Sequence, residues 1–324
     1  MNRRSLLGLL AVAPALRPVA THAEDAYPSK PIRIVVTVSA GGSIDTIARA
    51  YGEALAQQTG QPVVIENKPG ANGNIAAAAV AQAPPDGYTL LATGGSTLNL
   101  NPFLYRSLPF DPVKSFAPVI LTARTNFILV VHPKLGVDSV EAFVALAKAK
   151  PRTLNYGSAG TGSLIHIASE LFNGTVGIET NGVPYKGLAP AVNDLLAGQI
   201  DYMFDSATTM AHIQAGRLKA LAVIGPNRLP ALPEIATLAE HGIRGVEAAS
   251  GWHGLFAPAG TPPAVIARLN GLLQPILATP AIRQRIVALG AEPATSSVAE
   301  LAALLSEDLV RLEPIVKRTG ATLE

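Results

Sequence analysis

The sequence contains no cysteine. Disulfide bonds, thiolate metal sites, cysteine nucleophiles and a lipid-modified N-terminal cysteine are therefore excluded. Charged residues are also few, at 15% of the 324 residues, and no long apolar run occurs beyond the N-terminal segment. Because a helix that crosses a bilayer needs about 20 apolar residues, we expect no stable membrane insertion.

The N-terminal segment has the composition of an export signal. Two early arginines precede an apolar run from Leu6 to Ala13, and the small residues Thr21 and Ala23 stand where a cleavage site requires them. We predict that residues 1–23 are a cleaved signal peptide and that the product is periplasmic. The arginine pair fits the twin-arginine route as well as the ordinary secretory route, so the route stays open.

Basic residues do not gather in a long run. Removal of residues 1–23 takes away three arginines and no acid, which lowers Lys+Arg from 25 to 22 against 23 Asp+Glu and moves the formal net charge from +2 to −1. A near-neutral chain lacks the basic surface that nucleic-acid binding requires, so no nucleic-acid partner is expected. The scattered histidines show no pair at metal-ligand spacing, and we predict neither a metal nor a cofactor.

Apolar runs alternate with helical patterns, which indicates an α/β architecture. The run IRIVVTV (Ile32–Val38) is followed by a Gly-rich loop and then by apolar residues at helical spacing from Ile44 to Leu55. The same unit recurs with TLNY (153–156), a second Gly-rich loop and an apolar stripe from Leu164 to Phe172, where a second sheet begins. Because the strands are almost continuously apolar, we predict parallel sheets covered on both faces.

The tail of the chain is predicted to be helical. Helices are expected over 264–277 and 281–289, followed by a long helix after Ser297. Ser297 and Glu300 have the spacing of a capping box. Shorter helices are expected over 189–197 and 207–216, between the strands of the second unit.

Each Gly-rich loop leads directly into a helix. The first N–H groups of a helix have no internal partner and carry partial positive charge, and small residues let an anion approach them. Both loops follow strands, where ligands of open α/β sheets bind. We therefore predict a cleft in which a small carboxylate is bound without cationic side chains. The candidate residues are Ser39, Ala40, Gly41, Gly42, Ser43, Asp45, Ser158, Ala159, Gly160, Thr161, Gly162 and Ser163.

Several other polar residues allow two interpretations. His166 falls in the first turn of a predicted helix, where it is either a neutral ligand contact or a satisfied, partly buried histidine. Asp205 ends an apolar strand and either contacts the ligand or caps the next helix. The segment GANGN (70–74) is either a turn or a further anion loop. Trp252 is either a wall of the cleft or part of the core.

An enzyme remains the alternative to a binding protein. Ser158, His166 and Asp205 include the residue types of a hydrolytic triad, but no G-x-S-x-G elbow presents the serine. The loops also lack G-x-G-x-x-G and G-x-x-x-x-G-K-[ST], so the sequence contains no motif for dinucleotide binding or for a P-loop there. The enzyme alternative is a periplasmic hydrolase or lyase that uses His166 and Asp205.

The segments IRIVVTVSAGGSIDTIAR, NYGSAGTGSLIHIASELF, VPYKGLAPAVNDLLAGQIDYMFDS and WHGLFAPAGTP resemble the TctC/Bug family. Proteins of this family are periplasmic solute-binding proteins of tripartite tricarboxylate transporters. The resemblance runs from about Tyr27 to the C-terminus. It implies a two-domain Venus-flytrap fold of type II with two hinge crossings, no catalysis and capture of a small carboxylate. The implied domains are 24–126 plus 251–324 and 127–250.

The resemblance also implies positions for the site. The two family loops fall on Ser39–Asp45 and Ser158–Ser163, with His166 beside the second loop and Asp205 across the cleft. Further residues of the first-domain wall would be Thr93, Gly94 and Ser96. The family usually has Pro at the position of Ala40, and GANGNIA replaces a block richer in Gly.

These departures leave the ligand type open. A dicarboxylate, a tricarboxylate, an acidic amino acid and an aromatic carboxylate are all compatible with the resemblance. The implied partners are the membrane components of such a transporter, or a sensor. The implied oligomeric state is a monomer.

Overall fold

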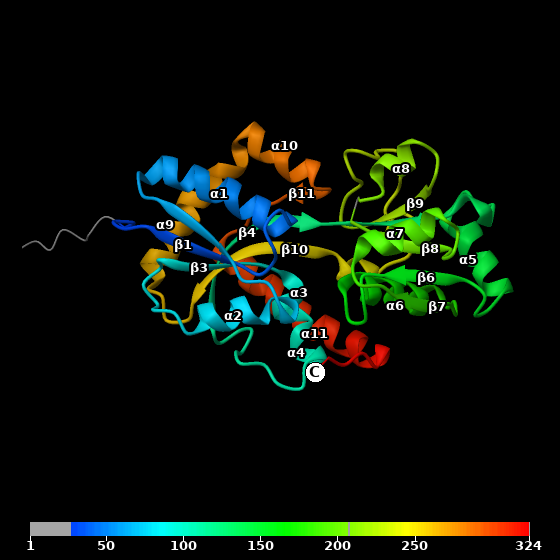
Figure 1. The fold of residues 1–324 in the computed structure, drawn as a ribbon, viewed down its shortest axis with the longest axis horizontal. Helices are drawn as coiled ribbons and strands as arrows, with labels where there is room; N and C mark the ends of the chain where they lie inside the picture. Colours follow the sequence, from blue (N-terminus) through cyan, green and yellow to red (C-terminus); the bar gives the residue numbers. More distant parts are fainter. Residues whose placement is uncertain (1–26, 207, 324) are drawn as a thin grey trace, which may run out of the picture.

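The computed structural model describes residues 27–206 and 208–323, so the predicted signal peptide lies outside the described residues. These residues form two lobes, each built around one sheet (Figure 1). The first sheet has six strands in the order β11-β4-β10-β3-β1-β2, and the second has five in the order β7-β6-β8-β5-β9.

The strands of the first sheet are β1 (Ile32–Val36), β2 (Val63–Asn67), β3 (Thr89–Gly94), β4 (Phe116–Thr125), β10 (Gly251–Pro258) and β11 (Ala291–Pro293). Those of the second sheet are β5 (Phe127–Val131), β6 (Asn155–Ser158), β7 (Asn181–Pro184), β8 (Tyr202–Asp205) and β9 (Lys219–Ile224). Strands expected from apolar runs are therefore present in both sheets.

Helices cover both sheets (Figure 1). The first lobe carries α1 (Ser43–Thr59), α2 (Asn74–Ala81), α3 (Gly95–Asn99), α4 (Asn101–Leu104), α9 (Pro263–Leu273), α10 (Pro280–Ala288) and α11 (Val298–Thr319). The second carries α5 (Val140–Ala149), α6 (Leu164–Val176), α7 (Leu188–Leu196) and α8 (Met210–Gln214). The capping box predicted at Ser297 and Glu300 is confirmed. Helix α8 is shorter than the predicted helix over 207–216.

The prediction of parallel sheets is wrong in part, because both sheets are mixed. Strand β1 pairs in parallel with β2 and β3, but β10 runs antiparallel to both β3 and β4. In the second sheet, β6 is parallel to β7 and β8, whereas β5 is antiparallel to β8 and β9. A buried antiparallel strand has the same continuous apolar run as a buried parallel one, so the run did not reveal strand direction.

The chain passes between the lobes at two neighbouring strands. Strand β4 ends at Thr125 and β5 begins at Phe127 in the other sheet, and β10 begins at Gly251 after the chain has left the second sheet. We propose domain boundaries at these points, at 126/127 and 250/251.

Helix α11 is an additional connection between the lobes. Near its beginning, Leu301 and Leu305 pack in a core cluster of the first lobe. Near its end, Leu312 and Ile315 pack with residues of the second lobe, such as Phe172 of α6. The C-terminal helix therefore spans the junction between the lobes, below the crossing strands in Figure 1.

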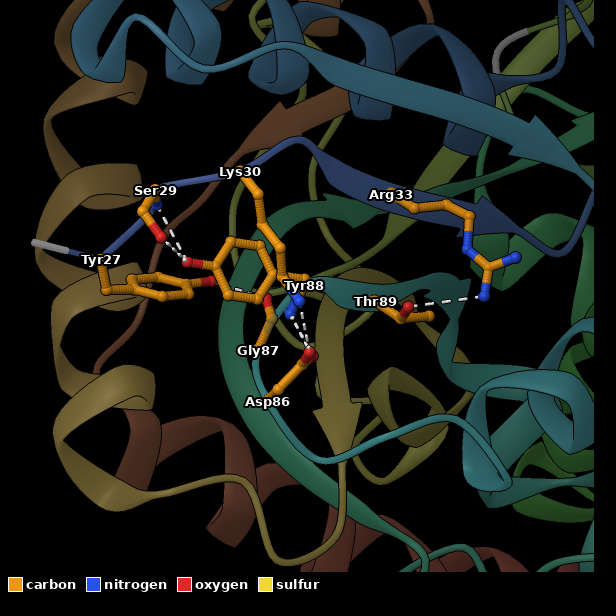
Figure 2. Close-up of polar contacts among 8 residues, drawn as sticks. All are labelled: Tyr27, Ser29, Lys30, Arg33, Asp86, Gly87, Tyr88 and Thr89. Carbon is orange, nitrogen blue, oxygen red and sulfur yellow. Dashed lines mark hydrogen bonds and ion pairs between the residues drawn. The ribbon is translucent and has the colours of Figure 1, made fainter. Parts of the chain in front are cut away.

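The beginning of the described chain is attached to the loop before β3 (Figure 2). The Tyr27 hydroxyl donates to the Gly87 carbonyl at 2.6 Å, and the Ser29 N–H donates to the Tyr88 hydroxyl at 2.9 Å. The Lys30 ammonium lies 2.9 Å from a carboxylate oxygen of Asp86 and 4.3 Å from the centroid of the Tyr88 ring. These contacts hold the residues before β1 against the loop before β3, at the end of the first lobe that lies away from the crossing strands (Figure 1).

Among the described residues, no single helix is long and apolar enough to cross a membrane. One pair of helices, Pro263–Ala278 and Pro280–Ala288, together has the length and composition of a membrane span, but the pair is bent by 80°.

Candidate functional site

A cleft of about 620 Å³ is lined by residues of both lobes. The first lobe contributes four segments: the loop after β1 with the first turn of α1, the loop before α2, the start of α3, and α4. The second lobe contributes the loop between β6 and α6. The lining residues are Thr37, Val38, Ser39, Ile44, Pro69, Gly70, Ala71, Asn72, Gly73, Gly94, Ser96, Thr97, Asn101, Ala159, Thr161, Gly162, Ser163 and Leu164.

Four helices begin at this cleft. Helices α1, α2 and α3 have glycine N-caps, Gly42, Gly73 and Gly94, and no side chain caps any of the three. Helix α6 begins after Ser163, whose hydroxyl accepts a hydrogen bond from the His166 N–H. Because the first N–H groups of a helix lack internal partners, the cleft is surrounded by main-chain donors.

Asp45 shapes the loop before α1 rather than lining the cleft. Its carboxylate accepts hydrogen bonds from the Gly41 N–H at 2.8 Å, from the Arg49 side chain at 3.0 Å and from the Asn67 side chain at 2.8 Å. Burial raises the pKa of this carboxyl, but the hydrogen bonds from Arg49, Gly41 and Asn67 outweigh burial and leave the pKa below its usual value. The buried carboxylate therefore holds the loop in shape.

The GANGN segment forms part of the cleft. Ala71 and Asn72 have left-handed backbone angles, with φ of 46° and 51°. The Asn72 carbonyl accepts hydrogen bonds from the Thr97 hydroxyl at 3.0 Å and from the Asn101 side chain at 3.1 Å. The segment therefore lines the cleft and leads into α2, and anion binding by it stays a prediction.

His166 supports the loop of the second lobe. Its Nδ1 accepts a hydrogen bond from the Gly162 N–H at 3.1 Å, and its ring stacks on Tyr156 with centroids 6.4 Å apart. Burial lowers the pKa of His166, partly against the charge of Glu170. A neutral imidazole is required for Nδ1 to accept, so His166 orders the loop as an uncharged side chain.

Asp205 is fully buried, and its carboxylate is engaged by the turn that follows it. The N–H and the hydroxyl of Thr209 donate to it at 2.8 and 2.9 Å, and the Thr208 hydroxyl donates as well. Asp205 therefore stabilises the turn before α8, but it is not the N-cap of that helix, which is Thr209.

The structure brings only some of the predicted residues to the cleft wall. Those that line it are Ser39, Gly94, Ser96, Ala159, Thr161, Gly162 and Ser163. Those found behind the wall or beside it are Ala40, Gly41, Gly42, Ser43, Asp45, Thr93, Ser158, Gly160, His166 and Asp205. Lining residues that the sequence did not indicate include Thr37, Thr97 and Asn101, because no motif links them to a helix beginning.

A second compartment of about 230 Å³, here called the hinge compartment, adjoins the cleft. It is lined where the chain crosses between the lobes. Its residues are Ile44, Gly94, Gly95, Ser96, Thr125, Phe127, Ala159, Ser163, Leu164, Ile165, Ser206, Gly251, Trp252 and His253. Trp252 lines this compartment rather than the cleft itself, and at only 2% exposed it is also part of the core.

Neither space has a charged wall in the part of the chain that the structure describes: no Lys, Arg, Asp or Glu lines it. Over the same residues, no group of three or more His, Asp or Glu could hold a metal ion. A ligand in this site would therefore contact main-chain N–H groups, hydroxyls, side-chain amides and apolar surface.

His253 makes the stability of the protein sensitive to pH. Burial lowers the pKa of its imidazole from 6.5 to about 4. Between these values the unfolded state binds more protons than the folded state, so the free energy of unfolding falls as the pH drops through this window. We expect His253 to account for a loss of about 2 to 3 kcal/mol between pH of about 7 and about 4.5.

Urea unfolding at the two pH values checks this expectation. On acidification, a His253→Gln variant should lose about 2 to 3 kcal/mol less unfolding free energy than the parent protein. An identical pH dependence in the two proteins would show that the His253 imidazole is not kept neutral by the fold.

Comparisons with known proteins agree with this architecture. The family model described as "Tripartite tricarboxylate transporter family receptor" matches residues 47–321. Protein BugT of Bordetella pertussis is 34% identical over 327 residues, with 100% of both chains covered.

Two similar solved structures contain a carboxylate. "R. palustris Rpa4515 with adipate" is 34% identical, covers 92% of this chain and 100% of its own, and has a TM-score of 0.77. "MatC (Rpa3494) from Rhodopseudomonas palustris with bound malate" is 33% identical, covers 90% and 100%, and has a TM-score of 0.72. The two-domain α/β flytrap fold predicted from the sequence is thereby confirmed.

Proposed function

Because the chain belongs to the family of tripartite tricarboxylate transporter receptors, we propose that it captures a small carboxylate in the cleft between its lobes. The family consists of periplasmic solute-binding receptors, not enzymes. Two similar proteins bind adipate and malate, which supports a carboxylate as the ligand class for this chain. The proposal includes periplasmic location after removal of residues 1–23.

One observation carries the proposal: four helices begin around a single cleft whose described wall has no cationic side chain. Main-chain N–H groups at helix beginnings bind anions through their free donors and the helix dipole. Charge-assisted hydrogen bonds contribute roughly 1.5 to 3 kcal/mol each. About five of them can offset the cost of association, roughly 4 to 15 kcal/mol, and leave micromolar affinity.

Capture would be completed by movement of the lobes. The cleft has walls from both lobes, so bringing them together would enclose the carboxylate and strengthen each hydrogen bond by excluding water. We propose that the closed form of a monomer then presents the ligand to the membrane components of a transporter, or to a sensor.

The enzyme alternative finds little support at its two proposed residues. His166 Nδ1 is occupied by the Gly162 N–H, and the Asp205 carboxylate is buried and engaged by Thr208 and Thr209. Neither residue lines the cleft. A hydrolase or lyase would need at least one of them to reach the substrate.

Isothermal titration of the protein without residues 1–23 tests the proposal. We expect at least one compound among malate, adipate, hexanoate and benzoate to bind with a dissociation constant of about 10 μM or lower. Matched uncharged amides, such as adipamide and benzamide, should bind at least about 100-fold more weakly, because they lack the anionic oxygens that the helix beginnings attract. Equal affinity for acids and amides, or binding of neutral sugars alone, would contradict carboxylate capture.

A further inference from the structure

The cleft and the hinge compartment are adjacent and share part of one wall. They share the wall residues Ile44, Gly94, Ser96, Ala159, Ser163 and Leu164. The hinge compartment then extends to Thr125 and Gly251, where the two crossing strands leave and enter the first sheet. A ligand bound at the helix beginnings can therefore place its remaining atoms in the hinge compartment.

The cleft and the hinge compartment differ in character. The cleft has polar side chains from Thr37, Ser39, Asn72, Thr97 and Asn101. Beyond the shared residues, the hinge compartment adds the large apolar side chains of Phe127, Ile165 and Trp252, together with the polar residues Thr125, Ser206 and His253. Phe127 and Ile165 are each 4% exposed and Trp252 is 2% exposed, so these walls belong to packed surroundings. Such walls favour an apolar part of a ligand over a polar one.

We propose that the hinge compartment holds the uncharged, apolar body of the ligand while the single carboxylate group lies in the cleft. The substrate class is then a monocarboxylate with an aliphatic chain or ring of about six carbons, since a cavity of about 150 Å³ is sufficient for a benzene ring. This inference rests on the proposed function, because it assumes that the cleft binds a carboxylate.

Charge argues against a second carboxylate in the hinge compartment. No Lys or Arg lines the described part of its wall, and its titratable residue His253 has a folded-state pKa of about 4 because of burial. The hinge compartment shares the beginnings of α3 and α6 with the cleft, at Ser96 and Ser163. In its deeper part, beside Phe127 and Trp252, a second carboxylate would lose its hydration without meeting an opposite charge, which is strongly unfavourable. A methylene group in the same place gains affinity, about fourfold for each one buried.

Two comparisons with the unmodified protein test this inference by isothermal titration. In the series butyrate, pentanoate and hexanoate, affinity should rise about fourfold for each methylene group, or roughly 15-fold in all. Hexanoate and adipate have the same six-carbon skeleton and differ by one carboxylate. We expect hexanoate to bind at least about tenfold more tightly than adipate, because the second charge is excluded from the apolar walls.

A variant that fills the hinge compartment supplies an independent test. Ser206 lines it and is half-buried. In Ser206→Leu the added side chain should occupy the space of the ligand body, so that hexanoate loses its roughly 15-fold advantage over butyrate. Ser306→Leu, on the exposed face of α11, is the matched control and should leave the full chain-length dependence.

The outcomes separate this inference from the proposed function. Tighter binding of adipate than of hexanoate, or equal affinity along the butyrate-to-hexanoate series, would overturn the apolar-body inference and leave carboxylate capture in place. Absence of binding by every acid tested would overturn both. An unchanged chain-length dependence in a folded Ser206→Leu variant would place the ligand body elsewhere.

Discussion

The Gly73→Ala variant should bind carboxylates about 100-fold more weakly than the parent protein, because a loss of this size equals about two charge-assisted hydrogen bonds. Gly73 has φ of +90° and a Cβ there would lie 2.5 Å from the Thr97 hydroxyl oxygen and 2.9 Å from Thr37 Cβ. Both neighbours line the cleft, and Thr97 also holds the Asn72 carbonyl. The substitution must therefore displace the loop that begins α2.

Gly60→Ala is the matched control for this variant. Gly60 also has positive φ, +70°, but a Cβ there would meet nothing within 4 Å. It should lose about 1 to 2 kcal/mol of stability from backbone strain and keep its affinity. Isothermal titration of both variants with the same carboxylate measures the two affinities. If Gly73→Ala bound as tightly as the parent, the loop before α2 would have no part in the site.

The Asp308→Ala variant should lose about 3 to 5 kcal/mol of unfolding free energy, as measured by guanidinium denaturation. One carboxylate oxygen of Asp308 accepts hydrogen bonds from the Trp252 indole N–H at 2.7 Å and from the Asn99 side chain at 2.8 Å. The other oxygen pairs with Arg311. Alanine would leave two buried donors without an acceptor, and each such donor costs about 1 to 3 kcal/mol.

An exposed acid on the same helix serves as the control. Glu313 pairs with Lys317, but both side chains are about half exposed or more. Glu313→Gln should therefore change stability by less than about 1 kcal/mol. A loss below about 1 kcal/mol for Asp308→Ala as well would mean that α11 is not anchored to β10 and α3 through this carboxylate.

Local patterns made much of the fold predictable. The apolar stripes of α1 and α6 are buried as their spacing predicted, with Tyr51 and Phe172 fully enclosed. Both predicted Gly-rich loops contribute residues to one cleft, among them Ser39 and Ser163. These features follow from periodicity and from the chemistry of helix beginnings, which act within a few residues of the chain.

Features that depend on contacts between residues far apart in the sequence were not predictable in the same way. Strand β10 lies between β3 and β4 and runs antiparallel to both, and its apolar run indicates neither its neighbours nor its direction. Likewise Asn101 belongs to the site because α4 lies beside the loop at Asn72, and Asp308 matters because α11 returns to Trp252. Tertiary packing brings these residues together, and no local spacing in the sequence indicates it.

The roles of individual site residues were also not predictable from local sequence patterns. The sequence predicts Asp45 as a ligand contact, and His166 as either a ligand contact or a satisfied, partly buried histidine. In the structure their polar atoms instead bind the loops themselves, at Gly41 and Gly162. A short polar residue next to a Gly-rich turn can satisfy either the ligand or the turn, and only the folded geometry distinguishes the two.

A crystal structure of the protein with a bound carboxylate tests the central claim most directly, through the contacts of the carboxylate oxygens. We predict oxygens within about 3.2 Å of main-chain nitrogens at the beginnings of α1, α2, α3 or α6, with partners from both lobes. A carboxylate held by a lysine or arginine side chain, or bound outside the cleft, would contradict the account.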